Sequence, residues 1–183
     1  MVDKLRAGYH VDVEWRPFYL RPDTPPEGTD LPEYIQRARA NGSEERLQAI
    51  ADSYGMPFRS TERIYNTRLA HEATEYAREH GRGNEFHHNL FRRVYADGLD
   101  PAQWSVLRDT ATQCGLDADE MQSQVEVGKY TVNVAEQVQM AYRIGVTGVP
   151  TYVVNGRYAV VGAQPYAVFE QLLERLKSGL IKL

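Results

Sequence analysis

The chain has 183 residues, a net charge of −4, and 42% apolar and 25% charged residues, a composition typical of a globular protein with a sizeable core. A nucleic-acid-binding module would show a basic face, which is missing. The sequence also lacks the run of about 20 apolar residues that a membrane-spanning helix needs, and the apolar core of a signal peptide. We therefore expect a cytoplasmic protein with no nucleic-acid or membrane partner.

The first predicted element is a β-strand over Val11–Pro17 (VDVEWRP). Val11, Val13 and Trp15 alternate with charged residues, a period that predicts one buried and one wet face. Pro17 cannot donate a hydrogen bond to a strand ladder and helps to end the strand. The proline-rich stretch that follows predicts a loop up to about Leu31.

The next 114 residues, 31–144, read as a block of helices. Apolar residues recur with helical spacing, and prolines, capping residues and glycines mark the starts and stops. The expected helices run from Pro32 to Asn41, from Ser43, from Ile64 to Gly81, from Asn84 to Gly98, from Pro101 to Gly115 and from Lys129 to Ile144, with a short turn over Asp117–Ser123.

After Gly145 the pattern changes to a β-hairpin and a final helix. Thr151–Val154 and Arg157–Val161 are rich in β-branched residues, and Asn155-Gly156 between them is typical of a type I′ turn. Pro165 marks the start of the last helix. Because a lone strand and a lone hairpin are marginal, we expect both β pieces to share one sheet.

The cysteine count limits the redox and metal chemistry. The single cysteine, Cys114, can form neither an internal disulfide nor a CxxC pair, and the five histidines show no metal-binding spacing. We expect no metal and no cofactor. Gly115 places Cys114 at a helix C-terminus, where the helix dipole disfavours a thiolate, so a small buried residue is the favoured interpretation of this thiol.

Three stretches carry a family resemblance: VDVEWRPFYLRP with the following PPEG, NTRLAHEATEYAREHG, and GVTGVPTYVVNGRYAVVGAQP. Together they resemble the DsbA-type branch of the thioredoxin superfamily, in particular FrnE-like cytoplasmic proteins. The resemblance implies an α/β thioredoxin-like fold with a large all-helical insertion. Its thioredoxin-like domain would comprise residues 1–20 and 145–183, and the insertion residues 31–144.

The sequence departs from the family pattern at its start. The family's first strand and its CxxC helix have no counterpart, and MVDKLRAG resembles the tail of that helix. We expect an N-terminal truncation or a start misassigned to Met1. A true variant, with its sheet completed by rearrangement or by a partner strand, and removal of the segment by cleavage are the alternatives. A partner strand would make the protein a homodimer.

The resemblance also implies the site residues. Gly148, Val149, Pro150 and Thr151 would bind the backbone of a thiol- or disulfide-containing protein or peptide beside a cis proline. The family would place Asn66, Thr67, His71, Gly162 and Gln164 along the cleft. For the first three, the structural interpretation is the favoured one, with Asn66 and Thr67 as helix caps and His71 as an interior residue. The aromatic residues Trp15, Phe18 and Tyr19 would line a peptide groove or belong to the core.

Three functions remain open at this point. The first is a thiol–disulfide oxidoreductase whose CxxC pair is missing from these residues, so that the chain as given has no catalytic residue and no dithiol exchange. The second is a non-catalytic, chaperone-like peptide-binding module. The third is a glutathione-dependent enzyme related to kappa-class transferases or hydroxychromene-carboxylate isomerases.

Overall fold

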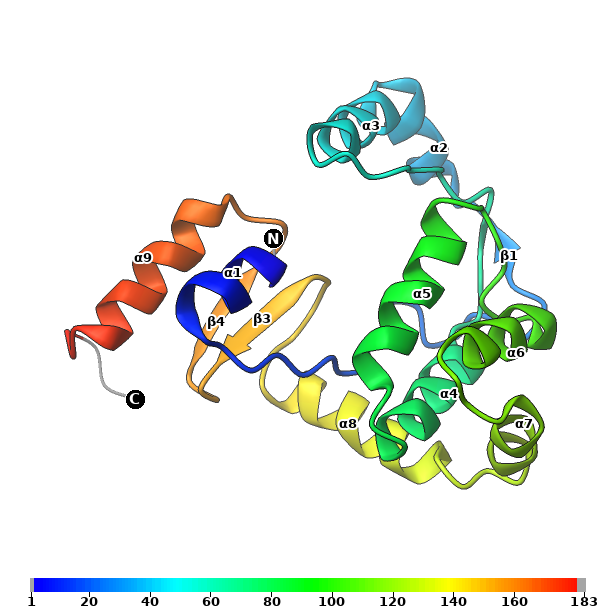
Figure 1. Cartoon of the computed structure of the whole chain (residues 1–183). Helices are drawn as coiled ribbons and strands as arrows, with labels where there is room; N and C mark the ends of the chain where they lie inside the picture. Colours follow the sequence, from blue (N-terminus) through cyan, green and yellow to red (C-terminus); the bar gives the residue numbers. More distant parts are fainter. Residues whose placement is uncertain (1, 181–183) are drawn as a thin grey trace. The chain divides into compact units, whose positions relative to one another are not determined.

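The computed structural model describes residues 2–180, which fall into two compact units, each described below by itself (Figure 1). The first unit comprises Met1–Leu20 and Gln137–Leu183, and the second comprises Arg21–Glu136. Residues 1 and 181–183, which the sequence assigned to the thioredoxin-like domain, lie outside the described residues. Helix α8 (Thr131–Arg143) begins in the second unit and ends in the first.

The core of the second unit is built by four helices, which bury large side chains against one another. They are α4 (Arg68–Glu79), α5 (Gly83–Tyr95), α6 (Trp104–Gln113) and α7 (Ala118–Glu126). Tyr76, Phe86, Leu107 and Met121 are almost completely buried. Phe86, Leu90 and Val94 all face this core, as the helical spacing of α5 predicted.

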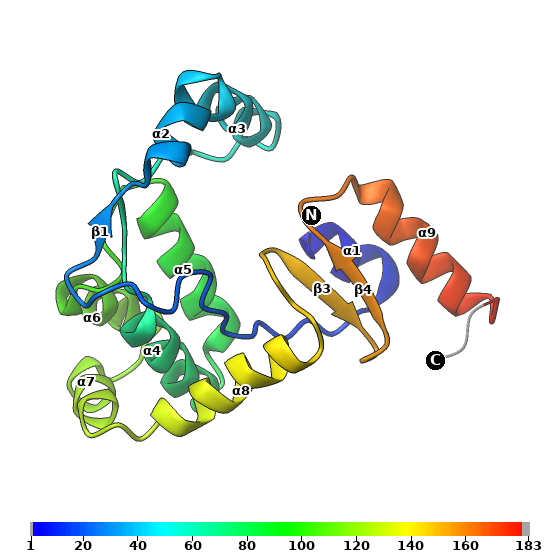
Figure 2. The same ribbon diagram turned by 180° about the vertical axis from the view of Figure 1, so that it is seen from behind.

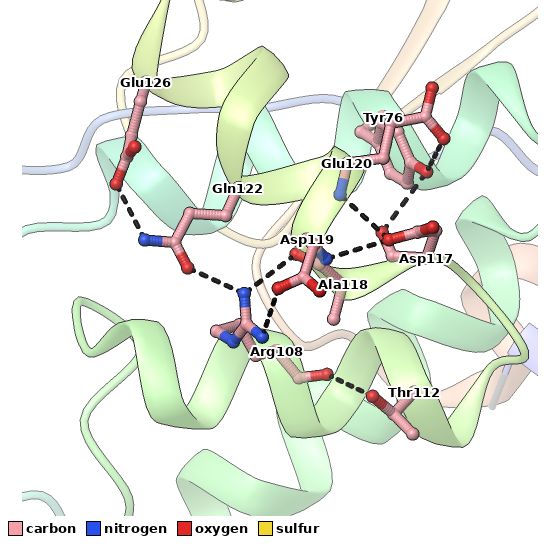
Figure 3. Close-up of polar contacts among 9 residues, drawn as sticks. All are labelled: Tyr76, Arg108, Thr112, Asp117, Ala118, Asp119, Glu120, Gln122 and Glu126. Atoms are coloured by element: carbon pink, nitrogen blue, oxygen red, sulfur yellow. Dashed lines mark hydrogen bonds and ion pairs between the residues drawn. The ribbon is translucent and has the colours of Figure 1, made fainter.

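Helix α7 corrects the prediction of a short turn over Asp117–Ser123, and a polar network fixes it in place (Figure 3). Asp117 caps α7 by accepting hydrogen bonds from the N–H groups of Asp119 and Glu120. Arg108 of α6 donates to Gln122 at 2.9 Å and pairs with Asp119, while the Tyr76 hydroxyl donates to Glu120 at 3.0 Å. The sequence prediction missed α7 because the apolar pattern of this helix is weak. Much of the stability of α7 comes from these contacts with other helices.

The second unit also contains a helical hairpin and a short ladder. The hairpin is α2 (Glu33–Ala40) and α3 (Ser43–Ser53), joined at Asn41-Gly42. The ladder pairs β1 (Thr29–Asp30) antiparallel with β2 (Arg63–Ile64). The predicted insertion is therefore not entirely helical, and the helix expected from Ile64 begins at Arg68.

The first unit contains the predicted β-hairpin and last helix (Figure 2). Strand β3 (Thr151–Val154) pairs antiparallel with β4 (Tyr158–Val161), and α9 (Tyr166–Lys177) follows. Asn155 and Gly156 have φ values of 52° and 67°, which confirms the predicted turn with two positive φ values. Tyr152 packs edge-on against Phe169 of α9, with ring centroids 4.7 Å apart.

The N-terminal helix α1 (Val2–Tyr9) packs on α9 in the same unit. Leu5 is buried, and the Lys4 ammonium lies 5.2 Å from the ring centroid of Tyr166. The helical character predicted for this stretch is thus confirmed over its described residues.

The prediction of a strand over Val11–Pro17 was wrong. This segment is irregular, yet its burial alternates as expected: Val11, Val13 and Trp15 are partly buried, and the charged residues between them are exposed. The alternation of apolar and charged residues indicates only which side chains face the interior. A strand also needs a neighbouring backbone with which to pair. None of the described strands pairs with this segment, so the two predicted β pieces do not form one sheet; β3–β4 and β1–β2 are separate two-stranded sheets.

Within residues 2–180 no helix is both long and apolar enough to cross a bilayer. The same residues hold no group of three or more histidine, cysteine or acidic side chains suited to a metal ion.

Candidate functional site

The loop Gly148–Thr151 ends at the first residue of β3. The Val149–Pro150 peptide bond is cis. The Val149 side chain is 55% exposed, and the N–H and C=O groups of this residue make no hydrogen bond to another described residue. The backbone of Val149 therefore has unused hydrogen-bonding capacity within the described residues.

Hydrogen bonds on either side hold this loop in place. The Thr151 hydroxyl donates to the carbonyl of Gly148 at 2.7 Å, and the Gly162 N–H donates to the carbonyl of Pro150 at 2.8 Å. Gly162 has a φ of +82°, a left-handed conformation that favours glycine. The side chain of Gln164 donates to the Val161 carbonyl at 2.9 Å and braces the same turn.

Strand β3 continues the loop as an edge among the described residues, because its ladder is with β4 alone. The face of the hairpin that carries Val153 and Val161 is open: these side chains are 44% and 58% exposed. Thr151 and Ala159 lie on that same face by register. An unpaired edge with an uncharged apolar face can add an extended peptide as a further strand.

The other three predicted cleft residues belong to the second unit and have structural contacts there. Asn66 donates to the carbonyl of Thr24 at 2.7 Å and accepts from the N–H of Arg68 at 2.9 Å, so it ties a loop to the start of α4. Thr67 is the N-cap residue of α4 by position but makes no side-chain cap bond, and His71 lies half-buried in the first turn.

Cys114 lies at the C-cap of α6 and is only 2% exposed. Burial raises the pKa of its thiol above the ordinary value, and the hydrogen bond that Asn89 donates to Sγ at 3.4 Å opposes this only in part. A thiol that is both protonated and covered is a poor nucleophile.

Comparison with known proteins identifies the family. The family described as DSBA-like thioredoxin domain matches residues 1–174. The chain belongs to this family. It is 27% identical over 169 residues to the uncharacterized protein YwbO of Bacillus subtilis, an alignment that covers 91% of this chain and 82% of that protein.

Solved structures of similar proteins agree with this assignment. A probable DsbA oxidoreductase from Streptomyces coelicolor is 27% identical with a TM-score of 0.86, over 99% of this chain and 83% of that one. A 2-hydroxychromene-2-carboxylate isomerase superposes with a TM-score of 0.78 at 19% identity, over 99% of this chain and 90% of that one, which shows a shared fold. The fold of the chain is therefore the DsbA-like thioredoxin fold with mostly helical content, as its sequence resemblance implied.

In this DSBA-like chain, residues 16–19 contact helix α8 within the first unit. Phe18 packs edge-on against Tyr142 with ring centroids 5.2 Å apart, and the Tyr142 hydroxyl donates to the Tyr19 carbonyl at 2.9 Å. Arg16 donates to Gln137 at 3.1 Å. These contacts give the Phe18 side chain a packing role and hold the backbone of Tyr19.

The sequence reasoning missed the buried acids of α4, of which Glu72 is the more deeply buried. Its carboxylate is fully buried, pairs with Arg68 at 3.0 Å and accepts a hydrogen bond from the Thr131 hydroxyl at the start of α8. The spacing of Arg68 and Glu72, four residues apart, was the available signal. Glu72 thereby fixes the beginning of α8, the helix that leads to the Gly148–Thr151 loop.

Proposed function

We propose that the Gly148–Thr151 loop binds an extended segment of a thiol-containing polypeptide, as the substrate-holding part of a DsbA-type thiol–disulfide oxidoreductase of the FrnE-like branch. The observation that carries this proposal is the exposed residue Val149, whose backbone groups make no hydrogen bond to another described residue, in a loop braced by Thr151 and Gly162. The DsbA-like family generally acts on thiol substrates, and a braced, open backbone favours strand-like binding because few of its atoms must be ordered on association.

The cysteine chemistry limits what these 183 residues do. Disulfide exchange by a dithiol enzyme requires one thiolate that attacks and a second thiol that resolves the mixed disulfide. The sequence has one cysteine, and that thiol is buried with a raised pKa. We therefore expect the 183-residue chain to bind its substrate without exchanging disulfides.

Peptide binding tests the proposal. Fluorescence anisotropy with a labelled, uncharged peptide that carries one cysteine should show saturable binding, and N-methylation of the peptide's central amides should weaken it by removing the backbone donors. Val149→Arg should also weaken binding, whereas Val132→Arg, at a comparably exposed valine of α8, should not. Equal binding of the plain and N-methylated peptides would contradict strand-like recognition.

Two further measurements separate this function from its alternatives. In an insulin-reduction assay the chain should give no rate above background. A rate that disappears in Cys114→Ser would show that the Cys114 thiol is reactive after all. Reduced glutathione should displace the peptide weakly or not at all; saturable glutathione binding that displaces the peptide would instead favour a glutathione-dependent enzyme.

A further inference from the structure

The α2–α3 hairpin differs from helices α4 to α7 of its unit because none of its residues is fully buried. Helices α4 to α7 each contribute buried side chains to the common core, whereas neither α2 nor α3 has a buried residue. Helices of eight and eleven residues lie below the ~12–15 residues at which an isolated helix is even marginally stable in water. Such a hairpin gains stability when its apolar face is covered.

The apolar face is continuous along α3. Leu47, Ile50 and Tyr54 recur at i, i+3 and i+7, which places them on one side of the helix. Met56 follows directly. Tyr34 of α2 is also exposed, with the Arg21 guanidinium 5.5 Å from its ring centroid. These five side chains, the α3 stripe and its neighbours, are 51–61% exposed.

The charges of the hairpin are balanced within it. Residues 33–53 carry four acidic and three basic side chains, a net charge of 3 − 4 = −1. Glu33 pairs with Arg37 at 2.5 Å and Glu44 with Arg39 at 3.6 Å, and Asp52 accepts a hydrogen bond from Gln48 at 2.8 Å. A second copy of the hairpin would therefore meet little electrostatic repulsion, whereas a strongly charged partner would find no opposite charge.

The exposed area matches the requirement of a modest dimer. The five half-exposed residues offer roughly 500 Å² per copy, so that two copies would bury at most about 1,000 Å², near the lower bound for a specific interface. Two identical hairpins that pack face to face form a four-helix arrangement, the smallest helical assembly that covers both faces.

We propose that the chain forms a two-fold symmetric homodimer in which the α3 stripe of one copy packs antiparallel against the α3 stripe of a second copy. A two-fold contact uses the same patch on both copies and closes on itself, so the assembly ends at two. This surface is different from the β3 edge and does not depend on the proposed peptide site.

Sedimentation equilibrium over a concentration series tests the proposal. The wild-type chain should pass from monomer to dimer as its concentration rises. Ile50→Lys should raise the concentration at which half of the chains are dimeric at least tenfold. Val132→Lys, at an exposed valine of α8, should leave that concentration unchanged. Because Ile50 is exposed in the single chain, circular dichroism of dilute Ile50→Lys should match the wild type and exclude unfolding as the cause.

Cross-linking then locates the two-fold axis. In a Cys114→Ser background, Ile50→Cys should give a disulfide-linked dimer on mild oxidation, whereas Val127→Cys, a more exposed position, should stay monomeric. A wild-type chain that stays monomeric throughout the series, or a dimer that survives Ile50→Lys and does not cross-link at position 50, would overturn the proposal.

Discussion

Replacement of His87 should remove much of the acid sensitivity of this protein. His87 lies partly buried on α5, with its ring stacked on Phe91 at a centroid distance of 4.2 Å. Burial, helped by repulsion from His88 and His71, lowers the pKa of His87 from 6.5 to about 4. The unfolded chain therefore takes up a proton more readily than the folded chain, and stability is lost as the pH falls from about 6.5 towards 4.

The size of the effect follows from the two pKa values. Between pH 7 and pH 5 the shift corresponds to about 2 kcal/mol of unfolding free energy, which partial exposure of the ring reduces to about 1–2 kcal/mol. Urea unfolding at both pH values should show that His87→Phe loses less stability than the wild type by this amount. The phenylalanine ring preserves the stacking on Phe91, so the comparison isolates the titration.

The neighbouring His88 provides the control. It is exposed, and its ring Nδ1–H donates a hydrogen bond to the Asn84 carbonyl at 2.9 Å. His88→Phe should retain most of the wild-type difference between pH 7 and pH 5. An equal loss of stability in the wild type and His87→Phe would refute the reasoning, because the acid sensitivity would then reside in other groups.

Three further substitutions test the fold by urea unfolding. Phe86→Ala, in the fully buried core, should cost about 3–5 kcal/mol, and a cost no greater than that of the half-exposed Phe91→Ala would contradict the assigned core. Gly156→Ala should cost about 1 kcal/mol, because a Cβ there has open space but the backbone φ is +67°; a neutral result would mean that the turn is of another type. Asp117→Ala should cost about 1 kcal/mol through loss of the α7 cap, and unchanged stability would show that α7 is held by its other contacts alone.

Local signals in the sequence predicted the elements that satisfy their own requirements. The Asn155-Gly156 turn and the β-branched runs on each side specify the β3–β4 hairpin without help from distant residues. The apolar period of α5 likewise placed Phe86 in the core. The positions of these elements follow from sequence because their hydrogen bonds are local, although α5 ends at Tyr95 instead of the predicted Gly98.

Elements that depend on distant contacts were predicted less well. The alternation in Val11–Pro17 encodes burial, but pairing depends on a neighbouring strand, and none of the described strands pairs with it. Helix α7 depends on Arg108 and Tyr76, which lie on other helices. The two-residue strands β1 and β2 carry no sequence period at all.

For the candidate site, the sequence identified the loop residues, whereas the structure supplied their bracing. The Gly148–Thr151 motif was evident from its resemblance to a known family. The bond from the Gly162 N–H to the Pro150 carbonyl joins residues twelve apart across the hairpin and follows only from the register of β3 on β4. The contacts of the buried Glu72 with Arg68 and Thr131 could likewise be seen only in the structure, because they depend on how α4 and α8 pack.

The central claim is that an extended polypeptide binds along the backbone of Val149. Nuclear magnetic resonance of the ¹⁵N-labelled chain, titrated with the cysteine-containing peptide, measures this at single residues. We expect the amides of Val149 and Thr151 to shift in a saturable way and the Val149 amide to exchange more slowly with solvent. Saturable binding with no change at these two amides would contradict the account.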